Sequence, residues 1–220
     1  MTQTKICGIT NIEDALVASQ CGAVALGFIF YPESPRYIKP EDAKIIINSL
    51  PNNLVSVGIF VNEKADKIKK TVDYCSLDMI QLHGDESPAY CRQFPESIII
   101  KAIELNNNDD IRYALTYHVA ALLVDTRHAG FYGGTGKKSN WDLASRLKSK
   151  KPLILSGGLN ADNIADALKT VAPAALDINS GVETSPGKKD HKKLTHIFDI
   201  IRTSDTTPEN SQFILKKRFI

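Results

Sequence analysis

Cys7 and Asp125 of this 220-residue chain combine a side chain that can transfer a proton with a position directly after a short apolar stretch. A thiol and a carboxyl group that face one substrate suit a reaction that needs one base and one acid. An ordinary thiol has a pKa of about 8.5 and is mostly protonated at pH 7, so Cys7 needs activation. An ordinary Asp has a pKa of about 3.9, so an acid role requires a raised pKa at Asp125. The alternatives are a buried structural thiol and a carboxylate that caps a helix or a loop.

Three further polar residues stand at or near the ends of apolar runs. Arg36 follows the second run, and its planar guanidinium suits a substrate carboxylate, with a surface ion pair as the alternative. His83 ends the fourth run, either as a polar contact to a substrate or as a hydrogen-bonded core imidazole, and we favour the contact. Asp177 lies near the end of the eighth run.

Three glycine clusters are candidates for loops that hold or cover a phosphorylated ligand. Ser156–Asn160 (SGGLN) ends the seventh run, and Asn179–Glu183 (NSGVE) ends the eighth. Glycines let backbone N–H groups approach an anion, and a following helix adds a favourable dipole. We therefore favour phosphate binding over simple tight turns. The third cluster, Gly133–Gly136 (GGTG), lies in a long segment between residues 127 and 140, and its glycines suit a lid over the substrate.

The elements that would position these residues are eight short apolar runs, which alternate with segments of helical pattern. The runs are Thr4–Cys7, Ala23–Phe30, Val55–Val61, Met79–Gly84, Ser97–Ile103, Ala120–Thr126, Pro152–Gly158 and Ala174–Gly181. They are continuously apolar, which is typical of parallel strands covered on both faces. Eight strand–helix units predict an α/β protein with a single closed (β/α)8 TIM barrel, and an open doubly wound sheet is the alternative. In a barrel, residues at the carboxyl ends of the strands gather at one mouth.

Helix boundaries are predicted from capping residues and apolar spacing. Thr10 and Glu13 form a capping box for the first helix, which would bury Ile12 and Leu16 and end at Gly22. Asn160 is predicted to cap the helix after the seventh strand. The buried faces of that helix and of the last helix are predicted to be Ile164, Leu168 and Val171, and Leu194, Ile197, Phe198 and Ile201.

The barrel is predicted to span residues 1–202, and residues 203–220 to form a C-terminal extension. The first half of the extension is polar and contains a proline, which favours a flexible segment. Residues 213–220 mix apolar and basic side chains. Such a mixture suits docking on the barrel or on a partner, but a ragged terminus is favoured.

The charge balance and the cysteines argue against several classes of protein. The chain has 27 Lys and Arg and 25 Asp and Glu, so its formal net charge of +2 gives no reason to expect nucleic acid or a membrane as partner. The N-terminus has no signal segment and no apolar run approaches the roughly 18 residues of a membrane span, so we expect a cytoplasmic protein. The cysteines lack metal-ligand spacing and are predicted to be free thiols: Cys7, Cys21, Cys75 and Cys91.

The sequence resembles the phosphoribosylanthranilate isomerases, the barrel enzymes of tryptophan biosynthesis. The resemblance rests on motifs that appear in order over residues 5–201: KICGIT, LGFIF followed by SPRYI, VGIFVN, QLHGDE, LLVDT, GGTGK, SGGLNADN and INSGVETSPGKKD. It implies an Amadori rearrangement of N-(5-phospho-β-D-ribosyl)anthranilate that needs neither a metal nor an organic cofactor. The ligand is then a small phosphorylated substrate, and we expect the chain to act as a monomer or a homodimer.

The resemblance also implies a role for each matching residue. By the family pattern, Cys7 is the general base and Asp125 the general acid. Arg36 would hold the anthranilate carboxylate, and His83 and Asp177 would lie close to the substrate. The residues that would bind the phosphate are Gly157, Gly158, Ser180 and Gly181, and those of the lid loop are Gly133, Gly134 and Gly136.

Two features depart from the family pattern. Lys138, Ser139 and Asn140 precede Trp141, where the family usually shows an aromatic residue and often an Asp, so the packing of the lid is in doubt. The chain also continues past Arg202, where the family usually ends, and the role of the extension is not inherited.

Other sugar-phosphate barrels and a non-catalytic phosphate-binding barrel are the alternative functions. An indole-glycerol-phosphate synthase requires catalytic Lys and Glu at several strand ends, and a ribulose-phosphate epimerase requires a metal site of His and Asp; neither pattern is seen. A bifunctional barrel of the histidine-and-tryptophan type needs two catalytic aspartates, whereas here the base position holds Cys7. A non-catalytic binder is disfavoured because both proton-transfer residues, Cys7 and Asp125, are present.

Overall fold

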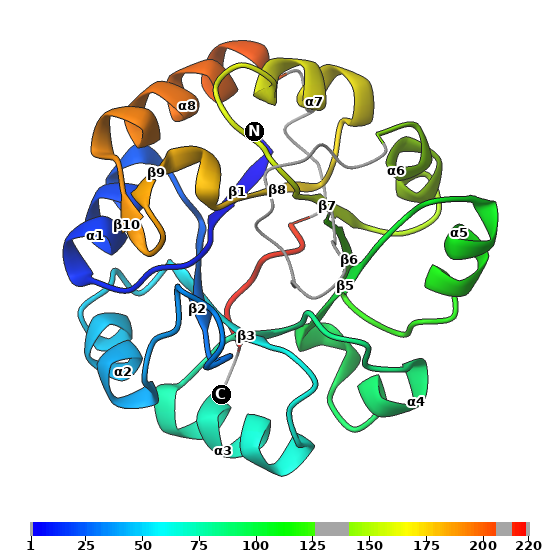
Figure 1. Cartoon of the computed structure of the whole chain (residues 1–220), viewed down its shortest axis with the longest axis horizontal. Coiled ribbons are helices and arrows are strands. Elements are labelled where there is room, and N and C mark those ends of the chain that lie inside the picture. Colours follow the sequence, from blue (N-terminus) through cyan, green and yellow to red (C-terminus); the bar gives the residue numbers. More distant parts are fainter. Residues whose placement is uncertain (1, 126–140, 206–212, 219–220) are drawn as a thin grey trace.

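The computed structural model describes residues 2–125, 141–205 and 213–218, which form a closed parallel barrel with helices around it (Figure 1). The strands are β1 (Gln3–Ile6), β2 (Ala25–Ile29), β3 (Val55–Phe60), β4 (Met79–Leu82), β5 (Ile99–Ile103), β6 (Ala121–Val124), β7 (Leu153–Leu155) and β8 (Ala175–Ile178). Each strand pairs with the next one along the chain, and β8 pairs with β1 to close the barrel. The predicted (β/α)8 barrel is confirmed, and the alternative of an open sheet is wrong.

Helices follow the strands and cover the outside of the barrel. They are α1 (Ile12–Cys21), α2 (Pro40–Asn48), α3 (Ala65–Cys75), α4 (Pro88–Cys91), α5 (Asn108–Ala114), α6 (Trp141–Lys148), α7 (Ile164–Val171) and α8 (His191–Ser204). Two short 3₁₀ helices, η1 (Glu96–Ile98) and η2 (Ser180–Val182), and a hairpin of β9 (Glu183–Ser185) and β10 (Lys188–Lys189) complete the described elements. None of the helices in the described part of the chain is both long enough and apolar enough to span a membrane.

Side chains along each strand alternate between two separate cores. In β6, Leu122 and Val124 pack outward with the helices, whereas Ala121 and Leu123 belong to a second cluster inside the barrel. Because both faces of the strands are buried, most strands are mainly apolar on both faces, and β1, which carries the buried Gln3 and Lys5, is the exception. This is the physical reason for the continuously apolar runs in the sequence.

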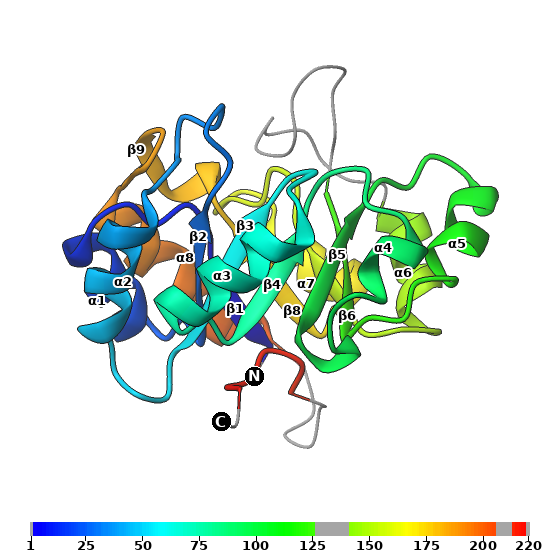
Figure 2. The ribbon, with the colours of Figure 1, turned by 90° about the horizontal axis from the view of Figure 1, so that it is seen from below.

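Residues 213–218 close the N-terminal mouth of the barrel, the end at which the strands begin (Figure 2). Ile214 and Leu215 are each 3% exposed and join the inner cluster. That cluster includes alanines at the first positions of β2, β6 and β8, whose small side chains leave room for the incoming pair. The favoured expectation of a ragged terminus is therefore wrong for these residues, because apolar spacing does not show the space left inside a barrel.

Hydrogen bonds hold this segment in a fixed register. The Gln3 side chain accepts the N–H groups of Ile214 and Leu215 at 2.8 and 2.9 Å and donates to the Leu215 carbonyl at 2.9 Å. Farther along, Lys217 Nζ lies 2.9 Å from Asp78 Oδ2, and the same carboxylate accepts the Arg218 N–H at 3.1 Å. The segment is thus docked by apolar burial, by hydrogen bonds from the Gln3 side chain to its backbone, and by charge together. The division of the chain at residue 202 stays a prediction.

The predicted start of the first helix is wrong. Asn11 caps α1, and its side chain accepts the Asp14 N–H at 2.8 Å, whereas Thr10 donates its hydroxyl to the Gly187 carbonyl. The buried face is also different: α1 buries Asp14, Ala15 and Ala18, and Ile12 is exposed. Asp14 is buried because its carboxylate accepts the Lys189 N–H at 2.8 Å. The predicted end is confirmed, since Gly22 has a φ of 114°.

The predicted cap of the later helix is also wrong. Asn160 Oδ1 accepts the Asp162 N–H at 2.9 Å and forms a turn, and α7 begins only at Ile164. The preference of Asn for such local turns competes with its preference for a helix cap. The predicted apolar faces of α7 and α8 are confirmed, because all of their residues are buried.

Candidate active site

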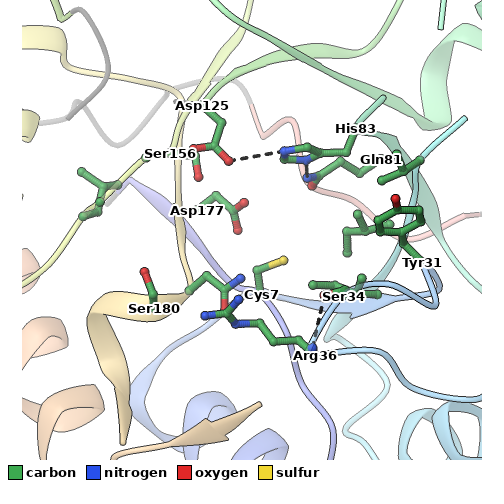
Figure 3. Close-up of a pocket in the computed structure, with 17 residues that line it drawn as sticks. Cys7, Tyr31, Ser34, Arg36, Gln81, His83, Asp125, Ser156, Asp177 and Ser180 are labelled. Carbon is green, nitrogen blue, oxygen red and sulfur yellow. Dashed lines mark hydrogen bonds and ion pairs between the residues drawn. The ribbon is translucent and has the colours of Figure 1, made fainter. Parts of the chain in front are cut away.

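A cavity opens at the C-terminal mouth of the barrel, the end at which the strands finish (Figure 3). It is partly open to solvent, and both polar and apolar side chains line it, which suits a small ligand with polar and aromatic parts. The predicted site residues that line it are Cys7, Arg36, His83, Asp125, Gly157, Gly158, Asp177 and Ser180. The structure therefore brings these residues together. The predicted lid residues lie outside the described part of the chain: Gly133, Gly134 and Gly136.

Cys7 is the first residue after β1. Its backbone N–H donates to the Ile178 carbonyl at 2.9 Å, which fixes this position against β8. Gly27 on β2 leaves room for the thiol, because a Cβ atom there would lie 2.9 Å from Cys7 Sγ. Burial raises the pKa of the Cys7 thiol, and the positive charge of Lys5 only partly offsets this effect. At pH 7 the resting side chain is therefore a neutral thiol.

Lys5 lies two residues before Cys7 on the same face of β1 and is fully buried. Its Nζ atom lies 2.7 Å from Asp177 Oδ1. Burial lowers the pKa of Lys5, but the attraction of Asp177 and of the Cys7 thiolate outweighs burial and raises the pKa. Lys5 therefore stays charged, and the pair puts a cation close to any thiolate that forms at Cys7.

Asp125 follows β6, and in Figure 3 Asp177 lies between Asp125 and Cys7. His83 Nε2 lies 3.3 Å from Asp125 Oδ2, close enough for an ion pair with a protonated imidazole but not aligned as a hydrogen bond. On the other side of the ring, Gln81 Nε2 lies 2.7 Å from His83 Nδ1. With the Gln81 amide in this orientation, Nδ1 accepts a hydrogen bond and Nε2 carries the proton toward Asp125. His83 is thus a cavity residue rather than a core imidazole.

Two backbone loops meet at one side of the cavity, after β7 and β8. Gly157 and Gly158 have φ angles of 89° and 71°, a left-handed conformation that favours glycine. Gly181 lies behind Ser180, and a Cβ atom at Gly181 would lie 2.0 Å from the Leu159 carbonyl oxygen. The two loops therefore touch backbone to backbone, which is possible only with glycine at this position. This arrangement leaves N–H groups at the cavity wall that suit a phosphate.

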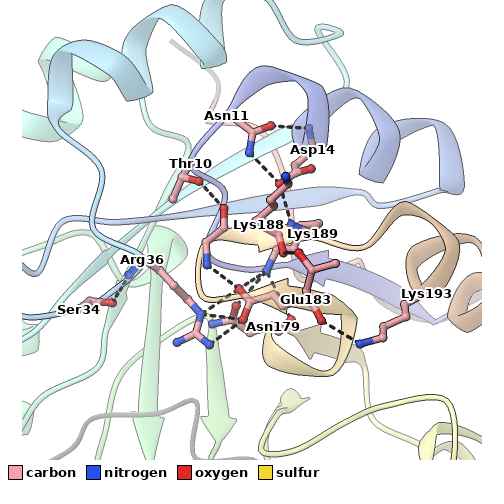
Figure 4. A network of polar contacts seen from close by, with 12 residues as sticks. Thr10, Asn11, Asp14, Ser34, Arg36, Asn179, Glu183, Lys188, Lys189 and Lys193 are labelled. Atoms are coloured by element: carbon pink, nitrogen blue, oxygen red, sulfur yellow. Dashed lines mark hydrogen bonds and ion pairs between the residues drawn. The ribbon is translucent and has the colours of Figure 1, made fainter.

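Arg36 reaches the cavity from the loop after β2, and its guanidinium is paired with Glu183 (Figure 4). Arg36 Nε lies 2.9 Å and Nη2 2.7 Å from the two carboxylate oxygens. Lys189 Nζ lies 3.0 Å from Glu183 Oε1. Burial raises the pKa of Glu183, but the hydrogen bond of Arg36 and the charge of Lys189 outweigh it and hold the pKa below its usual range. The three residues form one buried charged cluster.

Within the described residues, no group of His, Cys, Asp and Glu is arranged to hold a metal ion. The chemistry that this cavity can perform with its own side chains is proton transfer, between a buried thiol on one strand end and a carboxyl group on another. The glycine loops and Arg36 supply sites for two anionic groups of a substrate.

Comparison with known proteins identifies the family. Residues 4–200 match the family model of N-(5'-phosphoribosyl)anthranilate (PRA) isomerase. The chain belongs to this family. The membership confirms the resemblance in the sequence motifs and decides against the other sugar-phosphate barrels.

Individual phosphoribosylanthranilate isomerases are similar over almost their whole length. The enzyme of Syntrophus aciditrophicus is 49% identical over 202 residues, which cover 92% of this chain and 88% of that protein. The crystal structure of the Thermotoga maritima enzyme is 44% identical and has a TM-score of 0.86, and the match covers 92% of this chain and all of that one. A second similar structure, with 42% identity, a TM-score of 0.82 and the same two coverages, is described as a complex with reduced 1-(o-carboxyphenylamino)-1-deoxyribulose 5-phosphate.

The sequence analysis did not identify three buried ionic residues of this phosphoribosylanthranilate isomerase site: Lys5, Glu183 and Lys189. Lys5 could have been found, because a Lys inside an apolar strand, two residues before Cys7, must face the same side of that strand. Glu183 and Lys189 flank a Pro-Gly turn that forms the β9–β10 hairpin. The contact of Glu183 with Arg36 spans 147 residues, and no local pattern reveals it.

Proposed function

We propose that this protein converts N-(5-phospho-β-D-ribosyl)anthranilate into 1-(2-carboxyphenylamino)-1-deoxy-D-ribulose 5-phosphate, with Cys7 as base and Asp125 as acid. The aldose–ketose isomerisation, a step of tryptophan biosynthesis, follows from membership of the family. The observation that supports the two residue roles is that a buried thiol and a carboxyl group face one cavity from different strand ends. The structure carries the site on rigid strands, which suits proton transfer over short distances.

The first step is ring opening. Asp125 donates a proton to the ribose ring oxygen, the C1–O bond breaks, and the substrate nitrogen forms a protonated Schiff base with C1. His83 Nε2 lies 3.3 Å from the Asp125 carboxyl group at the cavity wall. The carboxylate that remains after proton transfer is stabilised by the His83 N–H.

The second step is the removal of the proton from C2. The Cys7 thiol has a raised pKa, so its thiolate is scarce but strongly basic once formed. The thiol first releases its proton to solvent, and two positive charges favour the resulting thiolate: the buried Lys5 ammonium and the iminium of the opened substrate. Loss of the C2 proton gives an enolamine, which tautomerises to the ketone. The substrate nitrogen acts as the electron sink, and the mechanism requires no cofactor.

Binding uses the two ends of the substrate. The phosphate binds at the backbone N–H groups of the loops that contain Gly157, Gly158, Ser180 and Gly181, and the anthranilate carboxylate binds at Arg36. Asp177, held by Lys5, lies between the acid and the base and contacts the sugar hydroxyls. These contacts fix C2 and the ring oxygen near Cys7 and Asp125, respectively.

The cellular setting follows from the same function. A small phosphorylated metabolite is the expected ligand, and the cytoplasm is the expected compartment. The protein acts as a monomer or a homodimer, which sedimentation at several concentrations distinguishes. The near-neutral net charge of +2 gives no support for a nucleic-acid partner.

The test is the fluorescence of freshly prepared phosphoribosylanthranilate. Wild-type protein should cause an enzyme-dependent loss of the substrate signal, and Asp125→Asn should abolish it because the amide cannot supply the proton. Asp199→Asn, an exposed Asp on α8, is the matched control and should retain full activity. No loss with the wild type would leave a phosphate-binding barrel without this activity. Full activity of Asp125→Asn would assign the acid to another group.

A further inference from the structure

The cluster of Arg36, Glu183 and Lys189 is more elaborate than binding by a single arginine requires. Glu183 is shared: it accepts from Arg36 Nε and Nη2, from Lys189 Nζ at 3.0 Å and from the Gly187 N–H at 3.2 Å. The Glu183 side chain is only 4% exposed, and that of Lys189 is fully buried. Burying a charge network of this kind costs desolvation free energy. Its position beside the cavity therefore suggests a role in ligand binding.

The cluster fixes the direction of the Arg36 guanidinium. Glu183 occupies the Nε edge, and no described residue forms a hydrogen bond or ion pair with Nη1. Gly8 leaves room for the Arg36 side chain. Its φ is 75°, and a Cβ atom there would lie 2.8 Å from Arg36 Cδ and 2.7 Å from Asn179 Oδ1. Arg36 therefore packs directly on the backbone at Gly8, and its Nη1 group is left for a ligand.

Charge counting shows what kind of group this set fits. Arg36 and Lys189 carry two positive charges and Glu183 carries one negative charge, so the cluster has a net charge of +1. Burial lowers the pKa of Lys189, and Glu183 opposes this only in part. A carboxylate that binds at Arg36 neutralises the single excess positive charge of the cluster. A ligand without a charge at this position leaves it uncompensated.

We propose that Glu183 and Lys189 select substrates that carry a carboxylate on the aromatic ring: Glu183 positions Arg36, and Lys189 supplies the unbalanced positive charge. This inference rests on the proposed function, because it concerns the anthranilate end of the same substrate. Neither residue touches the reacting carbons. Both are positioning residues, and their effect falls on affinity for the carboxylated ligand rather than on proton transfer.

The test compares two stable ligands by calorimetry. One is reduced 1-(o-carboxyphenylamino)-1-deoxyribulose 5-phosphate, and the other is its phenylamino counterpart without the carboxylate. Lys189→Met should lose about tenfold in affinity for the first ligand and nothing for the second, since one charge at this range contributes about 1–2 kcal/mol. Lys188→Met, the same change at the exposed neighbour, should leave both affinities unaltered.

Glu183→Gln tests the positioning part. It should raise KM for phosphoribosylanthranilate several-fold with kcat nearly unchanged, and it should reduce the preference for the carboxylated ligand. A variant that binds the phenylamino ligand as tightly as the wild-type protein does is thereby shown to be folded. Equal losses for both ligands, or no loss, would overturn this inference while wild-type turnover upholds the proposed function. A wild type that neither turns over the substrate nor prefers the carboxylated ligand would overturn both.

Discussion

The two mouths of the barrel meet the same physical problem in opposite ways. At each mouth the inside of the barrel must be filled. The N-terminal mouth is closed by Ile214 and Leu215, with backbone groups paired to Gln3. The C-terminal mouth instead keeps an open cavity with a buried thiol and ion pairs. Packing at the N-terminal mouth thus stabilises the fold. The buried charges at the C-terminal mouth lose hydration, and this offsets part of that stability.

Strand β1 connects the two mouths. The odd-numbered residues of β1 and the residue after it face the inside of the barrel: Gln3 holds the C-terminal segment, Lys5 pairs with Asp177, and Cys7 lines the cavity. Within this single strand the environment changes from apolar packing to proton chemistry over a few residues. Substitutions at the two ends of the strand should therefore affect different properties, stability at one and turnover at the other.

The largest effect is expected at the C-terminal mouth. Cys7→Ser should lower kcat by about 10²–10⁴-fold, because a hydroxyl cannot replace the thiol as base, and should change KM little. The free energy of unfolding should change by less than about 1 kcal/mol. Steady-state kinetics and urea unfolding measure both. Cys21→Ser, at a partly buried cysteine outside the cavity, is the control. Retained turnover would assign the base to another group, with His83 the first to test.

The second effect reverses this pattern at the N-terminal mouth. Replacing Ile214 and Leu215 together by Ala should lower the free energy of unfolding by roughly 3 kcal/mol, because both side chains leave a closed apolar space. At a temperature where the variant is folded, kcat should stay within twofold. Phe213→Ala, at a side chain that is 64% exposed, should be nearly neutral. A loss of turnover without a loss of stability would contradict the separation of the two mouths.

The third effect is a pH dependence confined to the C-terminal mouth. Because burial raises the pKa of Cys7, the thiolate fraction still increases with pH above neutrality. The rate at which iodoacetamide alkylates Cys7, which depends on the thiolate alone, should rise about tenfold per pH unit while Cys7 is mostly protonated, without a plateau below the ordinary thiol pKa of about 8.5. The pH–rate profile measures this rise. A plateau already present at pH 7 would show that the free enzyme holds Cys7 as a thiolate.

The smallest effect is expected when a charged residue is replaced at the N-terminal mouth, in comparison with one at the C-terminal mouth. Lys217 is 40% exposed where it pairs with Asp78, so Lys217→Met should cost less than about 1 kcal/mol of stability. Arg36→Met, which removes a largely buried charge from the cavity, should mainly raise KM. Thermal unfolding and steady-state kinetics separate the two outcomes. An unchanged KM would remove Arg36 from the site.

The sequence predicted the barrel because most strands are mainly apolar on both faces and several helices carry an apolar stripe, both of which are local properties. It predicted where Cys7, His83 and Asp125 lie because barrel strands end at one common mouth. It did not predict the cap at Asn11, where a partner 175 residues away, Lys189, buries Asp14. The docking of Leu215 and the pairing of Arg36 with Glu183 were missed for the same reason, since both depend on distant residues.

The link between Gln3 and Leu215 has a consequence for the synthesis of the protein. Their hydrogen bond joins residues 212 positions apart, so the partner of Gln3 leaves the ribosome long after the first strand has been made. All eight strands are complete by Ile178, yet the N-terminal mouth stays open until residue 215 emerges. A chain that stops before this point contains Cys7 and Asp125 but lacks Ile214 and Leu215, which fill the N-terminal mouth. Incomplete copies should therefore have a lower free energy of unfolding than the full chain.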